Sequence, residues 1–369
     1  MSRKANIINY IATILLTMVS IVGILNIVAV NYNVEVQEVL LEFVCFAITA
    51  GLIHTIAHEL GHLIFGKING FKFSSMVIWF FKWQKLGNKT AFSFVMFGDE
   101  AGYTEMIPTK EEGVENGFFA MTLGGLIASV IVTILGVPVL FITTLPRWLF
   151  MFWIMLIPIG IYFIFGTLLP SSTDGILNDG AVLYHLKKQT DNSKVMINLL
   201  KIQANLYCGK TPSEIDENLY FVVPQLAEDN PNFALLLNAR YAYYLDKKDY
   251  EGAKQTIKRL LSLEEYLPKQ YMYIFKTDAL YNACTFDKNE QVADDLMYEL
   301  EKYLNNINTA TTVRVKLAYL ININEQTEGL DMFIKKAKKE ANRCQIKGLG
   351  LYETKLLEDL ISISNESIQ

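Results

Sequence analysis

Long apolar runs dominate the first half of the chain and give way to charged, Leu- and Tyr-rich segments in the second half. A membrane-spanning helix needs about 20 apolar residues to cross about 30 Å of hydrocarbon. The runs that meet this requirement cover residues 7–30, 38–66, 117–144 and 148–169. The first run is too long for the core of a signal peptide, and no small-residue cleavage site follows it. The pattern therefore predicts about four transmembrane helices.

Basic residues orient these helices, because cytoplasmic loops carry an excess of Lys and Arg. Arg3 and Lys4 precede the first run, whereas the loop 31–37 contains neither residue type. The segment 67–116 carries six lysines, and Lys187 and Lys188 follow the last run. Every loop agrees with one orientation. We therefore expect a multi-pass protein of a cell membrane with both termini in the cytoplasm.

Residues 71–98 are short of a spanning length but rich in aromatic residues typical of strands. FKFSSMVIWFF and TAFSFVMFG flank a polar turn around Gly87 and Asn88, which predicts a small β-hairpin on the cytoplasmic side. The hairpin is either an interfacial loop or an edge strand that pairs with an extended substrate. The nearby Glu100 and Glu105 are expected to be solvated loop charges.

After about residue 185 the pattern becomes that of soluble amphipathic helices. Residues 232–264 predict two helices joined at Asp246–Lys248, and looser echoes follow at 278–303 and 315–340. The spacing from Ala253 to Ala293 exceeds the period of about 34 residues in tetratricopeptide repeats. We interpret this half as a divergent, tetratricopeptide-like helical-hairpin array.

The expected fold is an all-α membrane protein with one small hairpin, followed by the soluble helical array. Its expected divisions are an N-terminal transmembrane helix with an outer loop (1–36), a membrane core (37–188) and a cytoplasmic helical domain (189–369). The net charge of −5 and the lack of a basic face exclude nucleic acid as a partner. The four cysteines are scattered and predict free thiols rather than disulfides.

Three of the four histidines in the chain fall within nine residues, inside the second apolar run. On a helix, His58 and His62 lie one turn apart on the same face, so both can bind one Zn²⁺ ion. Glu59 points about 100° further round the helix, close to the metal without being a ligand. That placement suits a general base acting on water.

The motif occurs by chance in soluble proteins, but its position in an apolar span makes it a more specific sign of a metal site. An ionisable residue at the centre of a span costs about 2.5–3.5 kcal/mol on insertion scales, so a cluster predicts function. His54 lies one turn earlier and is expected to line the site or organise water, because three histidines in line do not converge on one ion. A catalytic zinc usually has a third protein ligand. Asp174 and Asp179, each followed by glycine, are candidates for it.

Taken together, these motifs resemble the site-2 protease family of intramembrane zinc metalloproteases in its bacterial form. The resemblance rests on the His58–Glu59–Leu60–Gly61–His62 motif, on Gly124–Gly125, and on Pro170 followed by Asn178–Asp179–Gly180. It covers roughly residues 40–185. It implies Zn²⁺ as cofactor, a later aspartate as the third ligand, and a membrane-spanning peptide or protein as substrate.

The chain departs from the family pattern at two positions. Thr167 stands where the family has asparagine, and the commoner spacing from proline would place the aspartate near Gly175. We prefer Asp179 over Asp174, because Asn178–Asp179–Gly180 opens an apolar helical run that would fix the carboxylate at a helix start. Thr167 and Asn178 are expected to line the site.

The sequence therefore predicts an intramembrane zinc endopeptidase, with His58, His62 and Asp179 as ligands and Glu59 as the catalytic base. The alternative is a non-catalytic membrane protein that docks a cytoplasmic partner through its helical array. A zinc transporter is disfavoured, because the third and fourth runs carry almost no polar residues. The expected partners are the substrate, the lipid bilayer and a cytoplasmic protein bound by the C-terminal helices.

Overall fold

The computed structural model of this chain describes residues 3–87, 89–96, 101–142, 144–173, 175–267 and 269–366. The chain divides by its contacts into two compact units. The first unit contains residues 1–84, 91–106 and 115–189, and the second contains 85–90, 107–114 and 190–369. Two short segments of the first half thus belong with the helices of the second half.

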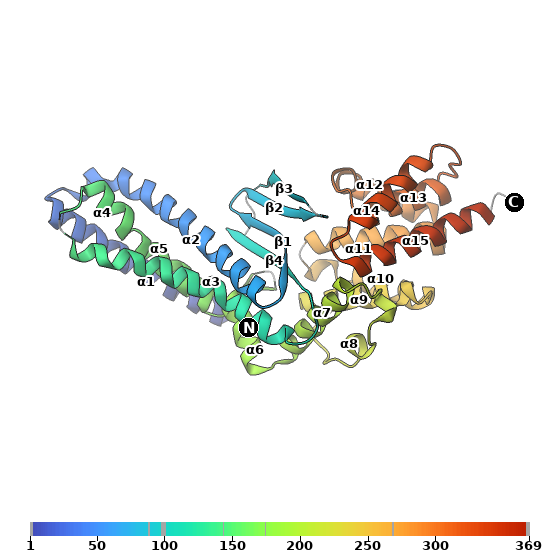
Figure 1. The fold of residues 1–369 in the computed structure, drawn as a ribbon, viewed down its shortest axis with the longest axis horizontal. Helices are drawn as coiled ribbons and strands as arrows, with labels where there is room; N and C mark the ends of the chain where they lie inside the picture. The colour runs from blue at the N-terminus through green and yellow to red at the C-terminus, as the bar shows by residue number, and fades with distance from the viewer. Residues whose placement is uncertain are drawn as a thin grey trace. The chain divides into compact units, whose positions relative to one another are not determined.

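The first unit is built on long apolar helices that lie side by side (Figure 1). In the part of the chain that the structure describes, four helical stretches are long and apolar enough to cross a membrane, which confirms the predicted number. They cover Ile7–Tyr32, Val36–Ile68, Val114–Phe141 and Arg147–Leu168. The helical elements of this unit are α1 (Arg3–Tyr32), η1 (Val36–Val39), α2 (Leu40–Ile68), α3 (Val114–Gly136), η2 (Val137–Phe141), α4 (Arg147–Ile154), α5 (Leu156–Leu168) and α6 (Asp179–Lys188).

The last of the four stretches is interrupted between α4 and α5. Pro158 has no N–H to donate to the carbonyl of Ile154, so the regular hydrogen-bond ladder fails there. Helix α4 accordingly ends at Ile154, and α5 begins at Leu156. The backbone around Met155 is buried in the apolar core that α4 shares with α1 and α2. Just after this break, the carbonyl of Leu156 lies 3.0 Å from His54 Nε2 of α2.

A four-stranded sheet follows α2, with strand order β3-β2-β1-β4. Its strands are β1 (Phe71–Ile78), β2 (Phe81–Leu86), β3 (Lys89–Phe94) and β4 (Gly102–Pro108). Strands β1 and β2 are antiparallel, with Ile78 opposite Phe81 across a two-residue turn. Trp79 in that turn has a φ of 56°, and its indole nitrogen donates to Thr55 Oγ1 of α2 at 3.3 Å. A second, two-stranded sheet joins β5 (Ser172–Thr173) and β6 (Ile176–Leu177).

The sheet is larger than the hairpin expected over residues 71–98. The expected first strand, 71–81, is divided by the turn at Trp79 into β1 and β2. Residues 102–108 form a further strand, so Glu105 does not lie in a loop, although it is exposed as expected. Glu105 lies in β4 and accepts hydrogen bonds from Ser74 and Ser75 of β1. Asn88 and Glu100 lie outside the described residues.

The second unit contains the helices of the C-terminal half. Helices α9 and α10 meet at residues 247–249, as their pattern predicts, and Asp249 caps α10 by accepting the N–H of Gly252. A tetratricopeptide-like repeat remains a prediction. The elements are α7 (Asp191–Tyr207), η3 (Pro212–Glu214), α8 (Asn218–Phe221), α9 (Pro231–Asp246), α10 (Tyr250–Leu261), η4 (Glu264–Tyr266), α11 (Lys269–Asn282), η5 (Ala283–Asp287), α12 (Glu290–Asn306), α13 (Ala310–Asn322), α14 (Asp331–Arg343) and α15 (Lys347–Glu366).

A charged pair lies inside this helical unit. Arg314 of α13 is 1% exposed, and its Nε donates to Glu353 Oε2 of α15 at 2.7 Å. The guanidinium also stacks on the ring of Tyr281 of α11, with Cζ 4.0 Å from the ring centroid.

Burial raises the pKa of Asp278 on α11 to about 7. The nearby Arg314 opposes this rise, and the negative charge of Glu353 adds to it. The core of this unit therefore contains a carboxyl group that titrates near neutral pH.

This carboxyl group predicts a pH-dependent stability. The pKa of Asp278 is about 7 in the folded chain against an ordinary value of 3.8, so the folded state retains a proton that the unfolded state loses. The free energy of unfolding consequently falls as the pH rises through that window. We expect Asp278→Asn to lose less thermal stability than the wild type between pH 5 and pH 8. Circular dichroism melting of the detergent-solubilised protein measures this difference.

The matched control is Asp295→Asn, which removes an exposed carboxylate from α12 of the same unit. Its melting temperature should follow the wild-type pH profile. A profile of Asp278→Asn that also matches the wild type would contradict the assignment of this proton to Asp278.

Candidate metal centre

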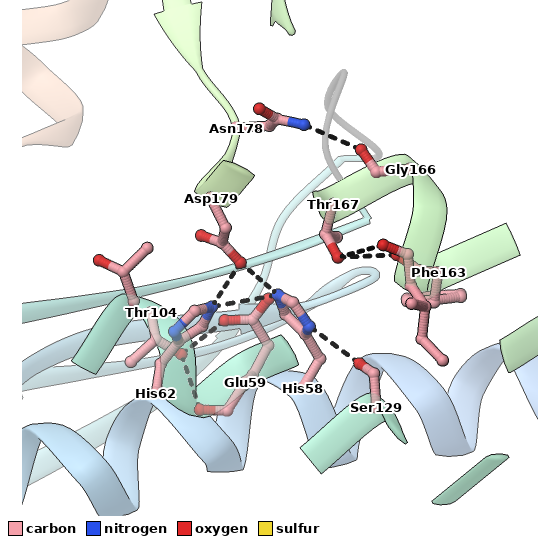
Figure 2. A network of polar contacts seen from close by, with 12 residues as sticks. His58, Glu59, His62, Thr104, Ser129, Phe163, Gly166, Thr167, Asn178 and Asp179 are labelled. Carbon is pink, nitrogen blue, oxygen red and sulfur yellow. Dashed lines mark hydrogen bonds and ion pairs between the residues drawn. The ribbon is translucent and has the colours of Figure 1, made fainter. Parts of the chain in front are cut away.

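Two histidine side chains of α2 meet on one face of the helix, as their spacing predicts. His58 and His62 are 7% and 8% exposed, and their Nε2 atoms lie 3.1 Å apart. The other ring nitrogen of each is held by α3. His62 Nδ1 bonds to the carbonyl oxygen of Met121 at 2.9 Å, and His58 Nδ1 lies 3.0 Å from Ser129 Oγ (Figure 2).

These partners fix which ring nitrogens are free. A carbonyl only accepts, so His62 Nδ1 carries the proton, and Nε2 of the neutral ring presents a lone pair. Ser129 can accept in the same way from His58 Nδ1. Metal-binding histidines usually donate their second ring N–H to such a partner, which fixes the tautomer and the ring orientation.

Asp179 completes the cluster from α6. Its Oδ2 atom lies 3.0 Å from His58 Nε2 and 3.3 Å from His62 Nε2. Among the described residues, His58, His62 and Asp179 form a group in which one ligand atom from each lies within 4.8 Å of the others.

The three atoms can bind a divalent cation. Oδ2 of Asp179 is buried without a hydrogen-bond partner in the part of the chain that the structure describes. Two imidazole lone pairs and a carboxylate oxygen that face one another repel, unless a cation or a proton lies between them. Two histidines and one carboxylate are a known ligand set for catalytic zinc, in which a fourth position stays open.

Asn178 holds Asp179 in this place. Its Oδ1 accepts the backbone N–H groups of Ala181 and Ser171, and so caps the start of α6. Its Nδ2 donates to the carbonyls of Gly166 and Leu169 at the end of α5. Asn178 therefore positions a ligand and ties α6 to α5. Asp174, the other candidate for the third ligand, lies outside the described residues.

Glu59 lies beside the metal group but is not part of it (Figure 2). The side chain is 4% exposed, and its Oε2 accepts a hydrogen bond of 2.6 Å from Thr104 Oγ1 of β4. A Cβ atom at Gly102 would lie 2.8 Å from Glu59 Oε1, so glycine lets β4 pass this close. Reasoning from the sequence missed Thr104, because the strand that carries it was interpreted as a loop.

The remaining predicted residues lie near the site without joining the metal group. His54 is fully buried, with Nε2 3.0 Å from the Leu156 carbonyl and its ring stacked on Phe163. Its Nδ1 has no hydrogen-bond partner among the described residues. Thr167 donates within α5 to the carbonyls of Phe163 and Ile164.

Glycines let α3 approach the ligands of α2 closely. A Cβ atom at Gly61 would collide with the backbone of Gly124, and one at Gly124 would collide with the Gly61 carbonyl and Phe65. At Gly125 it would meet the imidazole rings of both His62 and His58. The ligand rings are therefore confined by a backbone surface as well as by hydrogen bonds.

Comparison with known proteins gives one family. The model of peptidase family M50 matches residues 45–347, which is well over half of the chain and includes most of the helical unit. No curated protein matches, and neither does any solved structure. The family consists of membrane zinc metalloproteases, which agrees with the ligand set and the apolar helices described above. The chain belongs to peptidase family M50, the site-2 protease family.

Proposed function

We propose that this chain is an intramembrane zinc endopeptidase that hydrolyses a peptide bond in a membrane-embedded or membrane-proximal substrate. The observation that carries the proposal is that Asp179 of α6 lies beside His58 and His62 of α2, with Glu59 alongside. Helix α2 belongs to a stretch long and apolar enough to span a membrane. Burying ionisable groups within a membrane-spanning helix costs free energy, so their presence there indicates a function.

His58, His62 and Asp179 would hold the ion. When bound, zinc lowers the pKa of water towards about 7 and polarises the scissile carbonyl. Glu59 takes the proton from the attacking water and returns it to the leaving amine. The hydrogen bond from Thr104 orients the Glu59 carboxylate and leaves its other oxygen for the water.

The substrate is proposed to bind as an extended strand. A helical peptide bond is shielded by its neighbours, so the substrate must unwind before cleavage. Among the described strands, β4 is the end strand of its sheet and has β1 as its neighbour. Because Thr104 of β4 touches Glu59, an extended peptide added to the outer edge of β4 would lie beside the base.

Thr104→Val tests the positioning of Glu59. A hydrogen bond to a charged group contributes about 1.5–3 kcal/mol, so its loss should slow turnover by roughly 10-fold or more. Zinc content should not change, because Thr104 does not contact the metal group. Cleavage of a quenched fluorescent single-span peptide in liposomes measures the rate. Thr104→Ser retains the hydroxyl and should restore turnover; equal rates for the valine variant and the wild type would contradict this role.

The wider setting is part of the same proposal. We place the chain in a cell membrane with both termini in the cytoplasm, and we assign to the C-terminal helices the recruitment of substrates or of a cytoplasmic partner. Helical arrays of this type commonly present extended binding surfaces.

Proteomics of peptides released from membranes tests the function directly. Cells with the wild-type chain should release peptides that cells with Glu59→Gln do not release. Zinc analysis of the purified protein should give one ion per chain, lost in His58→Ala and retained in His185→Ala. His185→Ala is the control, because His185 is the one histidine outside the cluster. Bound zinc without any difference in released peptides would favour the non-catalytic docking protein.

A further inference from the structure

Strand β4 belongs to both units of the chain. Residues 102–106 group with the apolar helices, and Thr104 among them touches Glu59. Residues 107–114, which comprise the end of the strand and the loop that follows it, group with the helical unit. The strand that lies over the base is therefore continuous with a segment that the helical unit holds.

Helix α7 holds this segment with two hydrogen bonds. Asn205 Nδ2 donates to Glu111 Oε2 at 2.8 Å, and the Cys208 thiol donates to the Thr109 carbonyl at 3.3 Å. Asn205 is 8% exposed, and its amide also donates to the Lys201 carbonyl at 2.9 Å, which fixes its orientation. These contacts attach the loop to a helix that packs on α9 and α15.

The turn between β2 and β3 also groups with the helical unit, while most of the two strands groups with the apolar helices. Residues 85–90 also group with the helical unit, and a Cβ atom at Gly87 would lie 3.3 Å from the Arg343 carbonyl of α14. Two segments of the sheet region, 85–90 and 107–114, are thus grouped with the helical unit.

We propose that Asn205 is a positioning residue that acts on Glu59 through Glu111 and β4, so that the helical unit controls the rate of cleavage. Thr109 follows Thr104 by five residues, or roughly 17 Å of extended chain. A hydrogen-bonded strand transmits a displacement along its length better than a loop does. A protein that binds the helical unit and shifts 107–114 would then change the contact between Thr104 and Glu59. This inference rests on the proposed function of Glu59.

The test is hydrogen exchange of the β4 amides at residues 102–106 in the full-length, zinc-loaded protein in nanodiscs. Asn205→Ala should accelerate this exchange about fivefold, the effect of losing one hydrogen bond of about 1 kcal/mol. Glu111→Ala removes the same bond without changing any helix and should have the same effect. The double variant should exchange no faster than either single variant.

Asn198→Ala is the matched control. Asn198 lies on the same helix, but its amide donates to the carbonyl of Leu219 in α8 rather than to the loop. It should leave β4 exchange and peptide turnover unchanged, whereas Asn205→Ala and Glu111→Ala should lower turnover several-fold with zinc content preserved.

Three results would overturn the inference. They are unchanged β4 exchange in Asn205→Ala, equal acceleration in Asn198→Ala, and faster exchange with normal turnover. The exchange measurement needs no substrate. It therefore decides whether β4 is coupled to the helical unit even if the wild-type protein cleaves no peptide, a result that would overturn the proposed function separately.

Discussion

Replacing Glu59 with glutamine is expected to slow peptide cleavage by about 10²–10⁴-fold, the usual contribution of a general base. Glutamine has the same shape but does not take the proton from water. Zinc content should be unchanged, because Glu59 lies outside the group of ligand atoms. Peptide release from liposomes, together with metal analysis of the same sample, separates the loss of proton transfer from the loss of the ion.

The control for this substitution is Glu42→Gln on the same helix. Glu42 lies in the first turn of α2 and forms an ion pair with Arg147 Nη2 at 2.6 Å. Its loss removes a carboxylate from α2 without touching the metal group, so cleavage should continue. If Glu59→Gln retained the wild-type cleavage rate, the proposed mechanism would be wrong.

Asp179→Ala is expected to release the metal. Loss of a supporting partner outside the ligand set already costs about 10–100-fold in metal affinity, so loss of a ligand should cost at least that much. Competition with a fluorescent zinc chelator measures the affinity directly and does not depend on activity. We expect cleavage to disappear in parallel at zinc concentrations that saturate the wild type.

Asp174→Ala provides the comparison, because Asp174 is the other aspartate followed by glycine in this region. It should bind zinc as the wild type does. Full retention of zinc by Asp179→Ala, with loss in Asp174→Ala, would reverse the assignment of the third ligand. The zinc affinity of Asn178→Ala should lie between those of Asp179→Ala and Asp174→Ala, because the substitution removes the cap that positions Asp179 but leaves the carboxylate.

The features that could be predicted from the sequence are those set by local spacing. Apolar runs of about 20 residues predicted the spans, because the thickness of the hydrocarbon fixes their length. Helical geometry placed His58 and His62 together, and the turn chemistry of Asn178 indicated a helix start at Asp179. Each of these inferences needs only residues that lie within one continuous segment of the sequence.

The features that could not be predicted depend on segments far apart in the chain. Ser129 and the Met121 carbonyl of α3 hold the imidazoles, although they follow His58 and His62 by 71 and 59 residues. Thr104 reaches Glu59 only because β4 adds to the edge of the sheet, and no periodicity shows which strand lies at an edge. The pairing of Asn205 with Glu111 spans 94 residues and leaves no local signal.

The close approach of α2 and α3 has a consequence for how this protein tolerates change. Gly61, Gly124 and Gly125 perform no chemistry, yet a single methyl group at any of them would displace a ligand helix or an imidazole ring. A survey of tolerated substitutions would therefore rank these three positions beside the ligands themselves. The function of this site therefore depends on the side chains of the metal group and also on positions that must be glycine.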